Sequence, residues 1–271
     1  MSAALLGLSD VGFRYPGRSG RSRRADGSAL ALDGVSFAVQ PGRHLGIVGE
    51  SGAGKTTVLR MLLGLASPDT GTVTFDGAPL DLRDRAGIRR FRAAVQPVFQ
   101  DPYSSLDPRQ RVDRIVGEPL RSLGVAGGSE ASDRVAAALE DVGLGADAGR
   151  RWPHEFSGGQ RQRIAIARAI AAGPELLIGD EPIASLDASL QARVAKLMRK
   201  LAVETGAALL FISHDLSVVR VIADDVAVMS AGRIVEYGPV DRVWSDPQDP
   251  YTQRLLAAIP VVDGLGTLPG V

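Results

Sequence analysis

The sequence contains no cysteine among its 271 residues. Disulfide bonds, thiol catalysis and metal sites that depend on cysteine ligands are therefore excluded. Net charge is also lacking, because 31 Lys and Arg residues balance 31 Asp and Glu residues, so we expect no overall attraction to DNA or to an anionic membrane. Long hydrophobic runs are missing too: the longest, such as residues 207–212, are far shorter than the roughly 18–20 residues that span a bilayer. A role at a membrane would therefore require docking to another protein.

Short apolar runs are present at residues 45–48, 176–178 and 208–212, and each is typical of a buried strand. Segments with helical spacing separate them, as in the run of leucines and valine over residues 190–201 that predicts an amphipathic helix after Asp187. Continuous apolar strands separated by helices predict a mostly parallel sheet that is covered on both faces.

Three other segments, residues 13–15, 35–39 and 72–75, are typical of strands joined by turns and predict a small antiparallel sheet. Residues from about 103 to 172 are rich in helical patterns and predict an inserted lobe. The Gly-, Ser- and Arg-rich stretch 18–28 is better interpreted as a solvated loop than as a nucleic-acid contact, because no aromatic residues lie between its arginines.

Residues 49–56 fit the phosphate-binding P-loop pattern, between a predicted strand and a predicted helix. Glycines let such a turn curl until its N–H groups point at phosphate oxygens, and the start of the helix adds about half a positive charge. Lys55 can reach the β- and γ-phosphates of a nucleotide, and the Thr56 hydroxyl can bind Mg²⁺. The motif alone indicates an NTPase. The nucleotide contacts expected from this stretch are Gly49, Glu50, Ser51, Gly52, Ala53, Gly54, Lys55, Thr56 and Thr57.

Two acidic residues follow the apolar strand at residues 176–178. The carboxyl end of a parallel strand is where such sheets bind ligands. Asp180 is therefore a candidate to hold Mg²⁺, directly or through water, and Glu181 is a candidate general base for an attacking water. A solvated acidic turn before Pro182 is the alternative, and it is disfavoured because the pair completes the metal site that Thr56 begins.

The stretch at residues 156–163, Phe-Ser-Gly-Gly-Gln-Arg-Gln-Arg, resembles the signature motif of the ABC family of ATP-binding transporter subunits. A Ser-Gly-Gly turn could simply cap a helix through Ser157. In ABC proteins the turn also presents the helix N-terminus to the γ-phosphate held by the partner subunit. The resemblance therefore implies nucleotide contacts from Ser157, Gly158, Gly159 and Gln160.

Four more positions match the pattern of this family. Tyr15 stands where an aromatic ring stacks on adenine, and Gln100 stands where a glutamine meets Mg²⁺ and the γ-phosphate. Asp187 belongs to a Ser-Leu-Asp segment that resembles the D-loop, and His214 resembles the switch histidine. Each position has a plainer interpretation when taken alone: Tyr15 could be a strand-edge aromatic, and His214 could cap the helix that follows it.

The resemblance covers nearly the whole chain and implies an α/β fold. Its core would be of the P-loop NTPase (RecA-like) type, with a small antiparallel β subdomain and an α-helical subdomain inserted at about residues 103–172. The ATPase domain would span residues 1–250, and residues 251–271 would form a short C-terminal tail. ATP and Mg²⁺ are the implied ligands.

A finer resemblance points to the importers of oligopeptides, dipeptides and nickel. Phe156 replaces the usual leucine of the signature, which is typical of that group. Asp249 stands where the tail motif usually has histidine, and the iron–sulfur cluster that some members carry on cysteines is excluded. The other matching segments are residues 99–109, 118–120, 152–155 and 250–252.

The implied function is ATP hydrolysis that powers the import of a di- or oligopeptide or a related solute. Two ATPase subunits, either two copies or this chain with a related one, would close around two ATP molecules. Two transmembrane permeases and, indirectly, an external substrate-binding protein are the expected partners, and no nucleic acid is expected. The expected location is the cytoplasmic face of the bacterial inner membrane.

The sequence leaves several alternatives. An importer of nickel or of another small solute stays open, and so does a non-transport ABC ATPase such as a subunit of a phosphonate-breakdown complex. An exporter is disfavoured because most exporters fuse the ATPase to membrane helices, of which the sequence shows none. A module that holds ATP without cleaving it is disfavoured because Glu181, Gln100 and His214 are all of the competent type.

Overall fold

The computed structural model describes residues 4–15, 30–99, 105–180 and 188–259. At its centre is a six-stranded sheet in the order β10-β9-β3-β8-β7-β6. Strands β9, β3, β8, β7 and β6 run parallel to one another. Strand β10, at the edge of the sheet, pairs antiparallel with β9. The prediction of a mostly parallel sheet is therefore confirmed. The strands are β3 (His44–Val48), β6 (Val95–Val98), β7 (Leu176–Asp180), β8 (Ala208–Ser213), β9 (Asp225–Ser230) and β10 (Arg233–Pro239).

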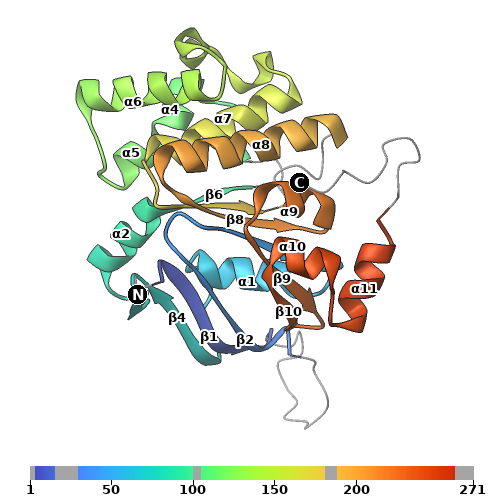
Figure 1. Cartoon of the computed structure of the whole chain (residues 1–271). Coiled ribbons are helices and arrows are strands. Elements are labelled where there is room, and N and C mark those ends of the chain that lie inside the picture. The colour runs from blue at the N-terminus through green and yellow to red at the C-terminus, as the bar shows by residue number, and fades with distance from the viewer. Residues whose placement is uncertain (1–3, 16–29, 100–104, 181–187, 260–271) are drawn as a thin grey trace.

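Both faces of this sheet are covered, as the apolar runs predicted. Alternate residues of the fully buried β8 belong to different cores: Leu209 and Phe211 pack with the helices α8 (Ala188–Thr205) and α9 (Leu216–Ile222). Leu210 and Ile212 pack on the opposite side with α1 (Lys55–Leu62). The helix predicted after Asp187 is thus confirmed as α8. Figure 1 shows α8 above the sheet and α1 below it.

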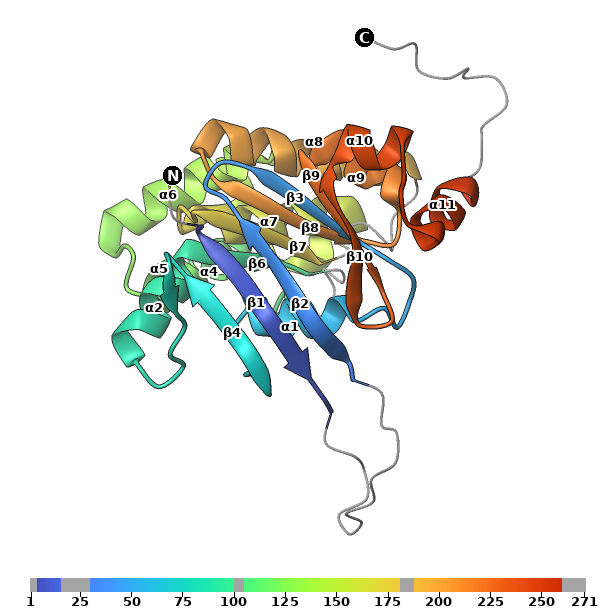
Figure 2. The ribbon, with the colours of Figure 1, turned by 60° about the horizontal axis from the view of Figure 1, so that its bottom comes forward.

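A second, antiparallel sheet covers the α1 side and has the order β2-β1-β4-β5. This confirms the small antiparallel sheet, which crosses in front of the parallel sheet in Figure 2. The expected strand at residues 13–15 was wrong, because the strand ends at Phe13. Asp10 has a positive φ of 50°, and the pairing of β1 with β2 shifts register between Leu8 and Val11, so the alternation of apolar residues is interrupted. The strands are β1 (Leu6–Phe13), β2 (Leu32–Val39), β4 (Thr70–Phe75) and β5 (Ala78–Pro79).

A group of helices lies between β6 and β7 in the chain and forms the upper part of Figure 1. Its central helix is α7 (Gly158–Ala171), which contacts α4 and α6 and whose Ile164 and Ile166 are fully buried. The other members are α4 (Val112–Val116), α5 (Glu118–Ser122), α6 (Gly128–Asp141), η1 (Ala146–Arg150) and η2 (Pro153–Glu155).

The remaining helices of the described ranges are α2 (Arg85–Ala94), which precedes β6, and α10 (Val240–Ser245) and α11 (Pro250–Ala257), which follow β10. Both α10 and α11 contact β10, and they lie beside it in Figures 1 and 2. Within the ranges that the structure describes, no helix combines the length and the hydrophobicity that crossing a bilayer requires. The arginine-rich stretch 18–28 lies outside those ranges.

Candidate nucleotide-binding site

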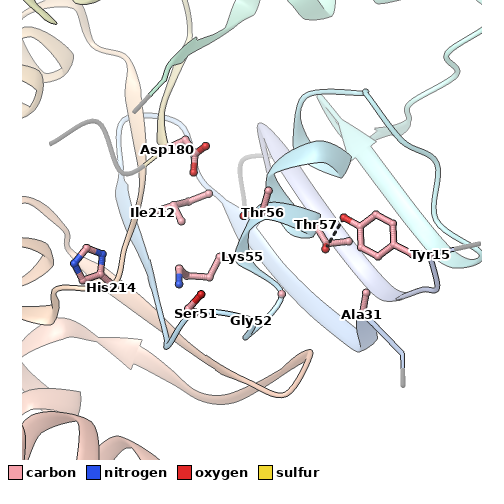
Figure 3. A pocket seen from close by; sticks show the side chains of 11 residues that line it. Tyr15, Ala31, Ser51, Gly52, Lys55, Thr56, Thr57, Asp180, Ile212 and His214 are labelled. Atoms are coloured by element: carbon pink, nitrogen blue, oxygen red, sulfur yellow. Dashed lines mark hydrogen bonds between the residues drawn. The ribbon is translucent and has the colours of Figure 1, made fainter. Parts of the chain in front are cut away.

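A cleft of about 560 Å³ opens where three neighbouring parallel strands end. The turn after β3 forms its floor, Asp180 ends β7, and Ile212 and His214 come from the end of β8. Parallel strands bring their carboxyl ends to one edge of the sheet, which is why residues so far apart in sequence meet here. Figure 3 shows the lining side chains. They belong to Tyr15, Ala31, Ser51, Gly52, Gly54, Lys55, Thr56, Thr57, Asp180, Ile212 and His214.

The turn between β3 and α1 has a conformation that favours glycine. Gly54 is the N-cap of α1 with φ +105°, and a Cβ at this position would lie 2.9 Å from the carbonyl oxygen of Ala31. No side chain caps α1. The positive end of the helix dipole therefore faces the cleft, as at an anion-binding site.

Lys55 is buried within this turn. Its Nζ donates hydrogen bonds to the carbonyl oxygens of Gly49, at 2.7 Å, and of Glu50, at 3.1 Å. The ammonium group is thus held over the backbone of the P-loop and beside Thr56, which also lines the cleft. This arrangement concentrates positive charge where the pattern predicted phosphate groups.

Tyr15 and His214 stand at opposite ends of the cleft in Figure 3. The Tyr15 hydroxyl lies 3.1 Å from Thr57 Oγ1, and its ring packs edge-on against Phe13, with the centroids 5.1 Å apart. The hydrogen bond with Thr57 is the main reason that the pKa of Tyr15 lies below its usual value. The Tyr15 side chain is therefore fixed against the first turn of α1 although it is 48% exposed.

His214 follows β8, and its side chain is exposed at the rim of the cleft. The plainer interpretation, that it caps the next helix, was wrong. The N-cap of α9 is Asp215, whose carboxylate accepts a hydrogen bond from the N–H of Ser217 at 2.8 Å. His214 is thus left out of the cap and lies with the cleft residues.

The signature turn lies elsewhere, at the start of α7. Ser157 Oγ accepts the N–H of Gln160 at 3.4 Å, and Gln160 Oε1 accepts the N–H of Ser157 at 3.0 Å, which together form a capping box. Ser157 therefore caps α7, as the plainer interpretation of this turn predicted. Neither these two residues nor Gly158 and Gly159 are among the residues that line the cleft. The exposed Ser157 side chain leaves this turn accessible from outside the chain.

Three predicted site residues, Gln100, Glu181 and Asp187, lie outside the residues that the structure describes. Asp180 and Thr56 both line the cleft and together offer a carboxylate and a hydroxyl. Mg²⁺ prefers oxygen ligands and is commonly held by one or two carboxylates together with substrate phosphates and water. This pair fits that donor set, while the described residues contain no cluster of three His, Asp or Glu that could hold a metal by itself.

Sequence reasoning missed three residues of this site. Ile212 could have been found, because it ends a predicted strand whose carboxyl end faces the cleft. Ala31 could not have been found from the sequence, because it lies at the cleft only through the fold of the antiparallel sheet. Tyr251 of α11 accepts a hydrogen bond from the N–H of Glu50 at 2.9 Å, and no local pattern links two residues 201 positions apart.

Comparisons with known proteins agree with this arrangement. The family model described as ABC transporter matches residues 32–184. The chain is 47% identical over 259 residues to "Glutathione import ATP-binding protein GsiA" of Pectobacterium atrosepticum and equally to its namesake in Escherichia coli K12. These matches include 96% of this chain but only 42% of each relative, so the chain spans less than half the length of the curated relatives it matches.

Two solved structures resemble the fold. One is cbiO1 of Clostridium perfringens, described as part of the ABC transporter complex cbiONQ, with a TM-score of 0.77 and 29% identity over 90% of this chain and 92% of that one. The other is the ATP-binding cassette MJ0796, a dimer in a post-hydrolysis state bound to ADP and Pi, with a TM-score of 0.73 and 28% identity over 87% of this chain and 98% of that one. Both likenesses confirm the predicted α/β fold with a P-loop NTPase core.

Proposed function

Because the chain belongs to the ABC transporter family, we propose that it binds and hydrolyses ATP to power the import of a peptide-like solute. The observation that carries the proposal is the cleft in which Lys55, Thr56 and Asp180 meet. These are the side chains that phosphoryl transfer requires around the β- and γ-phosphates and their metal ion. The strand-turn-helix context of the P-loop supports the same assignment.

In the proposed reaction the chain supplies position and charge more than covalent chemistry. Lys55 and the amides at the start of α1 hold the phosphates, and Tyr15 stacks on the adenine. Mg²⁺, held by Thr56, Asp180 and Gln100, would neutralise phosphate charge. Glu181 accepts a proton from the attacking water, and His214 approaches the γ-phosphate from the end of β8.

The signature turn completes the site of a second ATPase subunit. Ser157 and its two glycines stand apart from the chain's own cleft and are accessible from outside, which supports a role toward a partner. Asp187 belongs to the same shared interface. The solved cassette MJ0796 is itself a dimer. The partner here is either a second copy or a related ATPase.

The permeases dock on the residues that follow Gln100. A separate cavity of about 240 Å³ is lined by Leu65, Phe99, Pro119 and others, and the Leu65 side chain is 62% exposed. An exposed apolar hollow of this kind fits a segment of another protein. Arg168 of α7 donates a hydrogen bond to the carbonyl oxygen of Ser105 at 2.6 Å, which ties the segment after Gln100 to the helix that begins at the signature turn.

The solute is of the peptide class. The two relatives are named as glutathione import proteins, and glutathione is a tripeptide. The segments at residues 99–109 and 250–252 also resemble those of peptide importers. A binding protein outside the membrane delivers the solute to the two permeases, and the ATPase acts from the cytoplasmic face.

The first experiment tests hydrolysis. Glu181→Gln keeps the size of the side chain but loses its basicity, so ATP turnover should fall by about 10²–10⁴-fold while binding survives. The variant should accumulate an ATP-bound dimer, which size-exclusion chromatography with Mg-ATP detects beside a phosphate-release assay.

Glu175→Gln is the matched control, since it removes an exposed carboxylate next to the opposite end of β7. It should hydrolyse ATP at the parent rate. If Glu181→Gln also does so and forms no dimer, the assignment of the general base is wrong.

The second experiment tests transport. The chain purified from membranes at native level should carry two permeases with it, and a peptide should stimulate ATP hydrolysis of the complex with its binding protein. Co-purification with soluble lyase subunits in place of permeases would contradict the transport proposal and favour a phosphonate-breakdown complex.

A further inference from the structure

The C-terminal helix α11 contacts the P-loop directly. The hydroxyl of Tyr251, at the start of this helix, accepts a hydrogen bond from the backbone N–H of Glu50 at 2.9 Å. We propose that Tyr251 is a positioning residue for nucleotide binding, which holds the Gly49–Glu50 peptide against which Lys55 rests. This inference rests on the proposed ATP-binding function and adds a residue from outside the P-loop to it.

The peptide between Gly49 and Glu50 is hydrogen-bonded at both ends. Its carbonyl oxygen, on Gly49, accepts a hydrogen bond from Lys55 Nζ at 2.7 Å, and its N–H, on Glu50, donates to Tyr251. A peptide group is planar and rigid, so an acceptor that fixes the N–H also fixes the direction of the carbonyl. Tyr251 therefore sets the place of the oxygen that holds the Lys55 ammonium group.

This peptide needs support from outside because of the residue before it. Gly49 passes so close to β9 that a Cβ would lie 2.3 Å from the carbonyl oxygen of Met229. Only glycine fits there, and glycine leaves the following peptide free to rotate. The hydrogen bond to Tyr251 limits that rotation.

Tyr251 is itself held in place by the start of α11. Its N–H donates to the carboxylate of Asp249 at 2.7 Å, which caps the helix. On β10, the Glu236 carboxylate accepts the N–H groups of Gln248 at 2.9 Å and of Asp249 at 3.2 Å. Burial acts to raise the pKa of Glu236, but these donors outweigh it, so its pKa lies below the usual value and the carboxylate stays charged. The strand thus anchors the helix that reaches the P-loop.

Tyr251→Phe tests the role of the hydroxyl. The variant keeps the ring, which packs against the core and has the Arg254 guanidinium over it, so its melting temperature without nucleotide should stay at the parent value. Its affinity for a fluorescent ADP analogue should fall about 3- to 10-fold, the usual effect of losing one hydrogen bond. The KM for ATP should rise by the same factor, with kcat unchanged.

Tyr237→Phe is the matched control, because Tyr237 lies on β10 in a different cavity and is 47% exposed. It should bind nucleotide like the parent. If Tyr251→Phe also binds like the parent, the inference is overturned while the proposed function stands. If the parent itself binds no adenine nucleotide, the proposed function fails first.

A double-mutant cycle with Lys55→Ala tests the route of the effect. When Lys55 is absent, the Gly49 carbonyl has no ammonium group to hold, so Tyr251→Phe should then change affinity by less than about 2-fold. The same fold-change with and without Lys55 would contradict a positioning role through this peptide.

Discussion

Helices α1 and α7 both begin at glycine-containing turns, but their first N–H groups find acceptors in different ways. Any α-helix starts with N–H groups that have no acceptor within the helix. α7 supplies its own acceptors, because Ser157 and Gln160 form a complete capping box. α1 begins at Gly54 without a side-chain cap. At α7 the capping box satisfies the N–H groups of Ser157 and Gln160, whereas the start of α1 is suited to an acceptor from outside the chain, such as a phosphate.

The surroundings of the two turns differ as well: one lies within a cleft and the other is exposed. The α1 turn forms the floor of a cleft and is held from several sides, by Lys55 from within and by Tyr251 from the C-terminal helix. The α7 turn has an exposed serine and does not line that cleft. One turn thus lies within a cleft of its own chain, and the other is exposed outside that cleft, where our proposal places a partner subunit.

Of the changes to these two turns, a change in the α1 turn should lower ATP hydrolysis the most. Lys55→Ala removes the ammonium group that the P-loop backbone orients, so ATP hydrolysis should fall by at least about 10²–10³-fold, as when one charged group that stabilises the transition state is lost. Nucleotide binding should weaken as well, while the circular dichroism spectrum should match that of the parent.

Lys196→Ala is the matched control, since it removes the same charge from the exposed face of α8. A phosphate-release assay compares the two variants. Parent-level hydrolysis in Lys55→Ala would show that this turn is not the phosphate site.

The main features of both turns could be predicted from the sequence. The P-loop was read from the sequence because its strand, glycines and helix are adjacent, and the same holds for the apolar strands β7 and β8. The capping role of Ser157 was the plainer interpretation of a Ser-Gly-Gly turn at the start of a helix. Features of this kind can be predicted because they depend on residues that lie close together in the sequence.

Other features depended on the folded chain and were not predicted. The bulge near Asp10 hid the first strand, because a shift of register destroys the alternation that marks a strand. The contact of Tyr251 with Glu50 joins residues 201 positions apart through the path of β10 and α11. The cap of α9 was not predicted either: the plainer interpretation placed it at His214, and the structure places it at Asp215.

A smaller effect than that of Lys55→Ala is expected at the α7 turn, and it separates capping from contact with a partner's phosphate. Ser157→Ala removes the cap and should lower the free energy of unfolding by about 1 kcal/mol, which is a fall of about 2–4 °C in melting temperature for a chain of this size. Ser157→Asp keeps an acceptor at the N-cap and suits the helix dipole, so its melting temperature should match the parent's or exceed it.

Activity should fall in both variants, although their melting temperatures differ. At protein concentrations where the parent's turnover no longer rises, both should hydrolyse ATP about 10- to 100-fold more slowly, because alanine loses a hydrogen bond to a charged group and aspartate sets a second negative charge against the phosphate. Calorimetry and a phosphate-release assay on the same samples give both quantities. If Ser157→Asp is as active as the parent, the serine only caps α7, and the difference between the two turns is structural and not a division of labour between subunits.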